Sequence, residues 1–387
     1  MYDAIIVGAR CAGSAAGLLL ARRERRVLVV DRATFPSDAF STHFVTPTGT
    51  ALLDRWGVVE PLKARGVPMF GALHMNVAGN RLTTEDVGIA PDPSCSPRRT
   101  DLDTTLAEAA GDAGAEVRLG VSVTDVLRDD AGRVNGVRLR DASGAVSEER
   151  ASVVIGADGR TSIVARSVAP AERDRHDIKG TGLFAYFDDF DWRSTEISLF
   201  DGTFIFVFPT AAQSACIGSA THIDNDAEVR ADPEAYFWKV LAQDAELAER
   251  VRAATRDGRW RLGELPHGWF RHSAGPGWAL IGDAAALKDP LPGHGITDSF
   301  LGAELLSQAI DEGLGDPAGL DESLSTYDSA LWSLLRPVYE ATVEASTYDW
   351  DANTALMKVA GVAELVRNEL AIVKAGGPWL REPAVAG

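Results

Sequence analysis

Hydrophobic positions at the start of the chain follow a strand–helix–strand pattern. An apolar run over Ala4–Val7 is followed by a turn of small residues, Gly8–Gly13, and then by a helical stretch that ends near Arg23. A second apolar run, Val27–Val30, is closed by Asp31. Short apolar runs on either side of a helix are typical of buried parallel strands. We therefore predict a βαβ unit at the N-terminus.

The same kind of pattern resumes after an interruption by Gly- and Pro-containing segments that extends to Pro97. Apolar residues at helical or strand spacing predict two helices and four short strands. The helices are Gly49–Trp56 and Asp101–Gly111, and the strands are Glu116–Val123, Val126–Arg128, Val134–Leu139 and Ser152–Gly156.

Strict alternation of side chains marks the middle of the chain, between about residues 179 and 220. Phe204, Phe206 and Phe208 fall on one face of a strand, and Ile205 and Val207 fall on the other. This alternation predicts a largely antiparallel sheet.

Helical patterns dominate the last part of the chain, with one strand among them. We predict helical stretches within Pro233–Ala254, a strand over Trp278–Ile281, a helix over Thr297–Ile310 and mainly helix as far as Lys374. The predicted fold class is α/β with mixed α+β character. It consists of a Rossmann-like domain interleaved with a β-sheet domain, followed by C-terminal helices.

Composition and charge narrow the possible partners. The chain has 387 residues, of which 45% are hydrophobic, and its formal net charge is −18. This length predicts two to three domains, and the charge disfavours nucleic acid and membrane surfaces as partners. The apolar stretches are too short to span a bilayer and no basic leader precedes them, so we expect a cytoplasmic protein. The three cysteines, Cys11, Cys95 and Cys216, offer no disulfide framework, and no metal site is expected.

The turn after the first strand reads GARCAG, Gly8–Gly13. Gly8 permits a tight turn, Gly13 allows close packing of helix on strand, and the helix N-terminus can bind a pyrophosphate. Arg10 stands where a second glycine is usual, and its guanidinium could pair with a phosphate oxygen. Asp31 ends the second strand, where a carboxylate can bind ribose hydroxyls. The turn therefore predicts nucleotide binding, with a purely structural turn as the alternative.

Two further turns complete a set of three. They read GADGRTS, Gly156–Ser162, and GDAAALKDPLPGHGITD, Gly282–Asp298. In this order, the three turns resemble the fingerprints of FAD-dependent monooxygenases of the aromatic-hydroxylase type. Their superfamily also contains geranylgeranyl reductases and flavin-dependent halogenases. The resemblance extends from about Asp3 to Leu306.

The resemblance implies FAD as the cofactor and assigns parts of it to residues. Asp283 would bind a ribityl hydroxyl, the loop containing Pro290 would pass the flavin ring, and Val123 would meet the adenine. Backbone amides at Ile296 and Thr297 would face the pyrimidine end of the ring, where reduced flavin carries negative charge. The full set of expected FAD-binding residues is Gly8, Arg10, Cys11, Ala12, Gly13, Asp31, Arg32, Arg99, Val123, Asp158, Gly282, Asp283, Gly293, Gly295, Ile296 and Thr297.

Candidates for catalysis and substrate binding are fewer. His43 would lie close to the flavin, as a hydrogen-bond partner or base for the substrate, or as a structural or FAD contact. Pro290 is the other catalytic candidate. Tyr186, Phe206 and Phe208 would line an apolar substrate site, with core packing as the alternative. The neighbouring Lys288 and Asp289 could adjust charge near the flavin, or form a local salt bridge or solvated loop.

The implied activity is monooxygenation. One oxygen atom from O2 would pass, through a flavin hydroperoxide, into a hydrophobic aromatic or olefinic small molecule of bacterial secondary metabolism. NADH or NADPH would bind transiently as reductant, or a separate flavin reductase would supply reduced flavin. The alternatives are a reductase that saturates carbon–carbon double bonds and an FAD-containing binding protein without turnover. Halogenation is disfavoured, because the Trp-x-Trp-x-Ile-Pro segment is absent and Lys63 is the only lysine before Lys179.

The resemblance also suggests domain boundaries. A discontinuous FAD-binding domain would comprise residues 1–70, 99–170 and 265–315. The substrate domain would comprise 71–98 and 171–264, and a helical region would follow over 316–387.

The family's usual histidine in the third turn is replaced by Ala286, so no proton-relay role is expected there.

Overall fold

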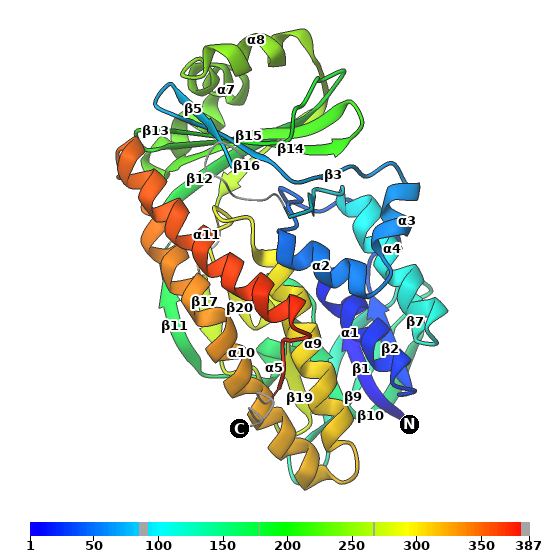
Figure 1. Cartoon of the computed structure of the whole chain (residues 1–387). Helices are drawn as coiled ribbons and strands as arrows, with labels where there is room; N and C mark the ends of the chain where they lie inside the picture. The colour runs from blue at the N-terminus through cyan, green and yellow to red at the C-terminus, as the bar shows by residue number, and fades with distance from the viewer. Residues whose placement is uncertain (85–91, 178, 266–267, 381–387) are drawn as a thin grey trace.

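The computed structural model describes residues 1–84, 92–177, 179–265 and 268–380. Two large β-sheets carry helices against them (Figure 1). The N-terminal unit consists of β1 (Tyr2–Val7), α1 (Cys11–Arg22) and β2 (Val27–Asp31), as the hydrophobic pattern predicted. The mixed α/β fold class is confirmed.

Parallel strands of the first sheet bring the three motif turns to one edge. Its main path runs β18 (Ala274–Gly275), β19 (Trp278–Leu280), β10 (Val146–Gly156), β1, β2 and β7 (Glu116–Leu119). β1, β10 and β19 pair in parallel, so their carboxyl ends lie at the same edge. The three turns follow these three strands directly, which explains why segments distant in sequence converge.

Helices cover the first sheet. α1 packs against α4 (Arg99–Asp112) and α9 (Gly295–Gly313), and α9 packs against the 29-residue helix α10 (Pro317–Ala345). α11 (Ala352–Lys374) follows and contacts both α10 and α2 (Pro47–Arg55). Figure 1 shows these last two helices, in orange and red, running along one side of the molecule.

The single strand predicted over Glu116–Val123 is divided in two. β7 ends at Leu119, and β8 (Ser122–Arg128) begins after a break at Gly120, which has a φ of +72°. That backbone conformation is readily adopted by glycine and turns the chain. β8 then pairs with β9 (Val134–Arg140) in an antiparallel arrangement that also joins β10.

The second sheet has seven strands, and most neighbours are antiparallel. In order they are β16 (Thr255–Glu264), β12 (Gly180–Asp188), β15 (Ser214–His222), β14 (Thr203–Ala211), β13 (Thr195–Phe200), β4 (Leu73–Val77) and β5 (Asn80–Thr83). Its two faces differ as the alternation predicted. Phe204, Phe206 and Phe208 belong to one apolar cluster, and Ile205 and Val207 pack in another with α7 (Pro233–Leu241) and α8 (Ala245–Ala253).

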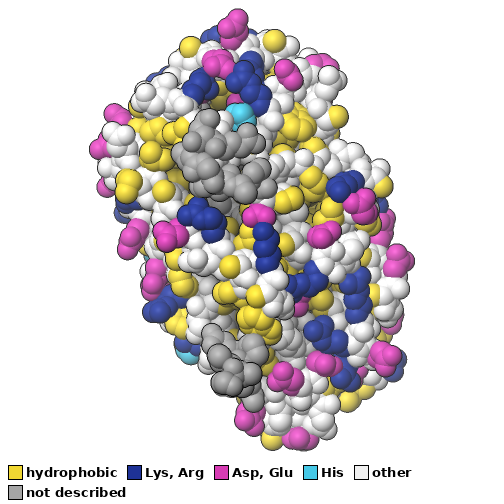
Figure 2. Space-filling model, in the orientation of Figure 1, with side chains coloured by type: hydrophobic (Ala, Val, Ile, Leu, Met, Phe, Trp, Pro, Cys, Tyr) yellow, Lys and Arg dark blue, Asp and Glu magenta, His cyan; other side chains and the backbone are white. Residues whose placement is uncertain are grey.

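Shorter elements connect the two sheets and the helices. They are α3 (Val59–Ala64), β3 (Met69–Phe70), β6 (Ser94–Cys95), α5 (Ile163–Val168), β11 (Glu172–His176), α6 (Asp226–Ala231), β17 (Gly268–Arg271) and β20 (Ala286–Leu287). The surface carries acidic and basic side chains interspersed with each other on the face shown in Figure 2. Within the described ranges, each helix is too short or too polar to cross a membrane.

Two glycines in helices test the packing, because replacing them by alanine should change the free energy of unfolding in opposite directions. Gly361 is exposed on α11, and a Cβ atom there would meet nothing within 4 Å beyond its own helix. Alanine is favoured over glycine in a helix interior by about 1 kcal/mol, so Gly361→Ala should raise the free energy of unfolding by about that amount. Gly17→Ala on α1 should lower it, because the new Cβ would lie 2.8 Å from Cγ2 of Val29. Urea denaturation of both variants would measure this, and a destabilised Gly361→Ala protein would contradict the open environment.

Candidate functional site

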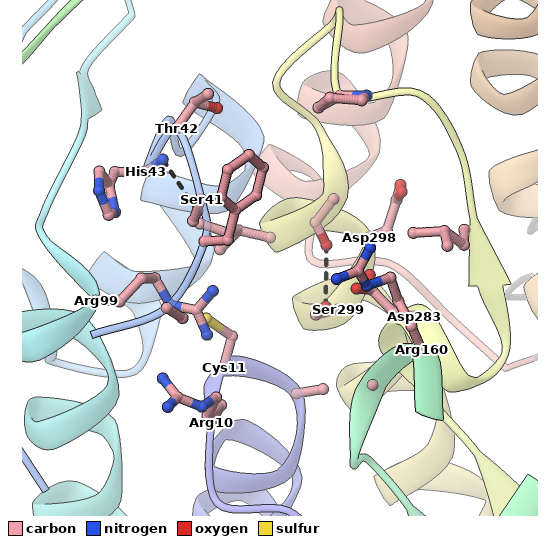
Figure 3. Close-up of a pocket in the computed structure, with 18 of the residues that line it drawn as sticks. Arg10, Cys11, Ser41, Thr42, His43, Arg99, Arg160, Asp283, Asp298 and Ser299 are labelled. Carbon is pink, nitrogen blue, oxygen red and sulfur yellow. Dashed lines mark hydrogen bonds between the residues drawn. The ribbon is translucent and has the colours of Figure 1, made fainter. Parts of the chain in front are cut away.

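A cavity of about 570 Å³ lies where the carboxyl ends of the parallel strands face the aromatic side of the second sheet. Most of its residues come from the turns after β1 and β10, from the 39–44 segment, from β12 and β14, and from the 283–299 segment. Figure 3 shows side chains approaching from two sides: Arg10, Cys11, His43 and Arg99 from one, and Arg160, Asp283, Asp298 and Ser299 from the other.

Most of the residues singled out from the sequence line this one cavity. They are Gly8, Arg10, Cys11, Ala12, Asp31, Arg32, His43, Arg99, Val123, Asp158, Phe206, Phe208, Asp283, Pro290, Gly293, Gly295 and Ile296. Such convergence of separated segments is typical of a binding site rather than of isolated turns.

Four predicted residues, Gly13, Gly282, Thr297 and Tyr186, lie behind the wall instead of on it. A Cβ at Gly13 would be 1.7 Å from the carbonyl oxygen of Gly8, so Gly13 allows α1 to pack on the turn. Gly282 has a φ of +60°. Thr297 forms a 2.8 Å hydrogen bond with Thr46 through their hydroxyl oxygens. These three support the wall, and Tyr186 is described below with His43.

Asp31 fixes the first turn. One carboxylate oxygen accepts a hydrogen bond from the Ala9 N–H and the other accepts one from the Ala33 N–H, both at 2.8 Å. A carboxylate oxygen can accept more than one hydrogen bond, so Asp31 keeps the capacity to bind ligand hydroxyls at the cavity wall.

Arg10 is engaged by a partner that the sequence reasoning did not single out. Its Nη1 lies 2.6 Å from Oδ2 of Asp103, and Arg99 binds the same carboxylate at 2.8 Å. Asp103 is almost fully buried, and Cys11 donates to it at 3.3 Å. A phosphate that binds the Arg10 guanidinium would therefore have to share it with Asp103. One feature of the sequence could have pointed to Asp103, namely its spacing of four residues from Arg99, which on a helix favours an ion pair.

Two half-buried carboxyl groups at the cavity have unused hydrogen-bonding capacity. Oδ1 of Asp158 is buried and has no partner in the described part of the chain, whereas Oδ2 accepts from the Ile163 N–H at 2.7 Å. Burial raises the pKa of Asp283, and the Arg99 guanidinium opposes that shift. Buried polar groups are normally hydrogen-bonded, so these two point to a ligand with hydroxyl or amide groups.

The start of α9 offers backbone donors to the same cavity. The first N–H groups of a helix have no partner within it, and Gly295 and Ile296 line the wall. A Cβ at Gly295 would meet nothing within 4 Å, so the wall is open at this point. Together with the free oxygens of Asp158 and Asp283, these donors fit FAD, which carries hydroxyl groups and a ring that becomes negatively charged on reduction.

An aromatic surface forms the opposite part of the cavity. Phe44, Phe208, Phe206 and Phe204 follow one another with ring centroids 5.0, 4.8 and 6.2 Å apart. The rings of Phe206 and Phe208 are nearly parallel, at 20°. Offset stacking of this kind favours a flat or elongated apolar ligand beside it. At the rim, the half-exposed Phe40 packs on Phe184, with centroids 5.1 Å apart.

His43 is held in a fixed orientation by Tyr186. Its Nε2 is hydrogen-bonded to the Tyr186 hydroxyl, and the residue is fully buried with a φ of +70°. Arg98 and Arg261 lie over the Tyr186 ring, 4.0 and 4.6 Å from its centroid. Burial lowers the pKa of His43 to about 3, with a further lowering from Arg99. The imidazole is therefore neutral near pH 7 and suits a hydrogen-bond partner better than a general base.

His43→Ala is expected to lower turnover more than flavin retention. The Nδ1 atom of His43 is buried and has no partner in the part of the chain that the structure describes, so it is available to a bound molecule. Loss of one such hydrogen bond corresponds to about a tenfold change in rate or binding. Turnover and the flavin absorbance per protein should be measured together. Tyr186→Phe is the matched control, because it frees the imidazole without removing it. Equal turnover in wild type and His43→Ala would assign His43 a structural role.

A buried group of four charged side chains joins the 283–299 loop to α11, and three of them, Lys288, His294 and Asp298, line the cavity. Nδ1 of His294 lies 2.7 Å from Asp298, and Nε2 lies 2.8 Å from Glu369 on α11. Lys288 pairs with the other oxygen of Asp298. Although burial lowers it, Glu369 and Asp298 raise the pKa of His294 to about 9. Lys288 thus forms a local salt bridge, which was one of the roles that the sequence suggested for it.

Sequence reasoning missed several residues on the wall. Arg160 lines the cavity and stands in the second motif turn, two residues after Asp158. Phe184 lines it too and lies on the same face of β12 as Tyr186, so the alternation could have revealed it. Glu369 is not among the lining residues, but it contacts His294, which is. No sequence signal pointed to Glu369, because His294 lies far away in the sequence.

Comparisons with known proteins identify the family. The profile of the "FAD binding domain" family matches residues 1–330. The menaquinone reductase of Mycolicibacterium smegmatis is 30% identical over 351 residues, which are 87% of this chain and 81% of that protein. Among solved structures, the flavin-dependent brominase Bmp2 has a TM-score of 0.79 at 18% identity, covering 97% of this chain and 100% of that one. PqsL, a probable FAD-dependent monooxygenase from Pseudomonas aeruginosa, has a TM-score of 0.75 at 22% identity, covering 94% and 99%.

These findings confirm the superfamily that the three motif turns suggested. The two structural likenesses establish the fold, and the profile match covers most of the chain. The chain belongs to the FAD binding domain family, within the flavoprotein superfamily of FAD-dependent oxidoreductases that includes reductases, halogenases and monooxygenases.

Proposed function

We propose that the protein is an FAD-dependent reductase that saturates a carbon–carbon double bond in a hydrophobic, olefinic small molecule. The observation that carries the proposal is the aromatic surface of Phe204, Phe206 and Phe208, which shares one cavity with the residues that fit FAD. Reduction is favoured over other chemistry by the similarity to a menaquinone reductase across 87% of the chain. When bound and reduced, FAD supplies a hydride to an olefin or activates O2.

The chain's own residues bind and orient the two partners. Asp283 and Asp158 would hold hydroxyl groups of the cofactor, and the first N–H groups of α9 would face the flavin ring. The phenylalanines would hold the substrate and exclude water from the site. The neutral His43 would bind a polar group at one end of the substrate.

Monooxygenation is the second candidate function. It is the activity that the three motif turns imply, and the aromatic half of the cavity also suits an electron-rich aromatic substrate. Water must be excluded in that reaction as well, so the phenylalanine surface does not distinguish reduction from monooxygenation.

The electron source is proposed to be NADH or NADPH, bound transiently, or a separate flavin reductase. Arg32 and Arg160 are exposed at the cavity wall. Each has no ion-pair partner within the described ranges, which leaves two cations for an anionic group. A nicotinamide nucleotide carries such groups in its phosphates.

Substrate turnover with and without oxygen tests the proposal. The purified protein would be loaded with FAD and given NADH or NADPH with menaquinone, polyenes and simple aromatics. A reductase forms product without oxygen, whereas a monooxygenase forms product only in air. If the flavin binds but no substrate stimulates consumption of reductant in either condition, the protein is a binding protein without turnover.

A further inference from the structure

One carboxyl group at the cavity, that of Asp289, has no positively charged neighbour acting on it among the described residues. Asp283 is influenced by Arg99 and Arg160, and Asp298 is paired with Lys288. The groups that act on Asp289 are the Leu291 N–H and the Tyr348 hydroxyl. Leu291 and Tyr348 both belong to the aromatic cluster, so this carboxyl lies on the side of the cavity where the substrate is proposed to bind.

The two oxygens of Asp289 are in different situations. Oδ1 accepts hydrogen bonds from the Leu291 N–H at 2.8 Å and from the Tyr348 hydroxyl at 3.0 Å. Oδ2 has no hydrogen bond from any residue that the structure describes, and Asp289 lines the cavity. A neutral carboxyl has one O–H donor. Because Oδ1 already accepts two hydrogen bonds, the proton is expected on Oδ2.

Tyr348 has an unfavourable backbone conformation and is packed closely against two glycines. It is almost fully buried and has a φ of +55°, which is unfavourable for a bulky residue. A Cβ at Gly180 would lie 2.6 Å from its ring, and a Cβ at Gly202 would lie 3.0 Å from its carbonyl oxygen. Two glycines therefore make room for a tyrosine in a strained conformation. Such strain persists only where the surroundings enforce it, and it is concentrated at functional sites.

Burial raises the pKa of Asp289 to about 7, and the hydrogen bonds from Leu291 and Tyr348 oppose this shift. A group with a pKa near the working pH can both release and regain a proton.

We propose that Asp289 is the proton donor of the reaction in this cavity and that Tyr348 is its positioning residue. The inference rests on the proposed reduction of a carbon–carbon double bond. One carbon receives a hydride with its electron pair, which reduced flavin supplies at the expense of NADH or NADPH. The π bond breaks, and the other carbon takes the proton from Oδ2. The electron pair of the broken O–H bond stays on the carboxylate, which then takes a proton from water.

The protonation of Asp289 can be measured without any turnover. Infrared spectra of the FAD-loaded protein, recorded as a function of pH, should contain a protonated-carboxyl band that titrates near pH 7. Asp289→Asn should abolish this band, and Asp349→Asn, the same change at an exposed carboxyl, should leave it unchanged. Tyr348→Phe should move the midpoint to higher pH, because the hydroxyl that lowers the pKa is lost. A band that persists in Asp289→Asn, or no such band in wild type, would overturn the inference.

The role in catalysis is tested by separating the two half-reactions. Without oxygen, the rate at which NADH or NADPH reduces the flavin should be the same in wild type and Asp289→Asn. Reoxidation by the olefinic substrate should be slower in the variant by about 100-fold or more, the usual contribution of a positioned acid. Asp289→Glu should restore part of the rate, and unchanged flavin content and melting temperature would exclude misfolding as the cause.

The possible failures are distinguishable. If wild type reoxidises with the olefin and Asp289→Asn does so equally fast, Asp289 is not the donor, and the proposed reduction stands. If wild type is not reoxidised by any olefin, the proposed reduction is wrong, and the donor role fails with it.

Discussion

Replacing Asp283 by alanine is expected to leave a folded protein that no longer retains FAD on purification. Asp283 is held at the cavity wall after β19, where its carboxyl has no hydrogen-bond partner in the described chain. A hydrogen bond to a charged group contributes about 1.5–3 kcal/mol, so its loss should weaken FAD binding by roughly 10- to 150-fold. The ratio of flavin to protein absorbance, followed by titration of the apoprotein with FAD, measures the effect.

In the protein without FAD, the same substitution should increase thermal stability. The pKa of Asp283 is raised in the folded state, chiefly by burial, so folding becomes less favourable as pH rises from the ordinary carboxyl range through the raised value. Without FAD, Asp283→Ala should therefore unfold at higher temperature than wild type at pH 8, and the gain should shrink at lower pH. Asp283→Asn, which keeps hydrogen-bonding groups, should retain more FAD than the alanine variant. Wild-type flavin content in Asp283→Ala would place the cofactor elsewhere.

Local features of the sequence were sufficient for much of this site. Gly8, Asp31 and Asp283 each stand within two residues of the end of a predicted strand, and parallel strands end at one edge of a sheet. Alternation alone placed Phe206 and Phe208 on a common face, because side chains on a strand point to opposite faces in turn. The family profile then confirmed the superfamily that the three turns had suggested together.

Partners in space could not be read from the sequence in the same way. Arg10 was expected at the cofactor site, where its guanidinium could pair with a phosphate, and the structure adds a second partner, Asp103, which is distant in the chain. Tyr186 was expected to line the substrate site or to pack in the core, and it lies in an apolar cluster with its hydroxyl hydrogen-bonded to His43. Tyr348 lies between α10 and α11 and meets Asp289 from 59 positions away in the chain. Ion pairs and hydrogen bonds of this kind depend on packing, and hydrophobic periodicity carries no information about them.

Replacing Asp298 by alanine is expected to destabilise the protein by about 3–5 kcal/mol. The change would leave Lys288 buried without its carboxylate and His294 with Glu369 alone, and a buried charge that loses its partner carries a penalty of that size. Urea denaturation at pH 7 measures it. Changing Asp298 to leucine together with Lys288 to methionine should recover much of the loss, because both charges are then removed.

The pH dependence of stability distinguishes this cluster from a simple packing effect. Although burial raises it, Lys288 and His294 lower the pKa of Asp298 to about 2, so its contribution is present above the ordinary carboxyl pKa and is lost as pH falls through 2. The pKa of His294 is raised to about 9. Its contribution is complete below its ordinary value of about 6.5 and is lost as pH rises through 9. Wild type should therefore lose stability between about pH 7 and 9 in a step that Asp298→Ala makes smaller. An equal loss in both proteins over that range would show that the imidazolium between Asp298 and Glu369 does not stabilise the fold. In that case α11 would be held in place by its other contacts, which include the hydrogen bond from the Thr48 hydroxyl to the Val366 carbonyl oxygen.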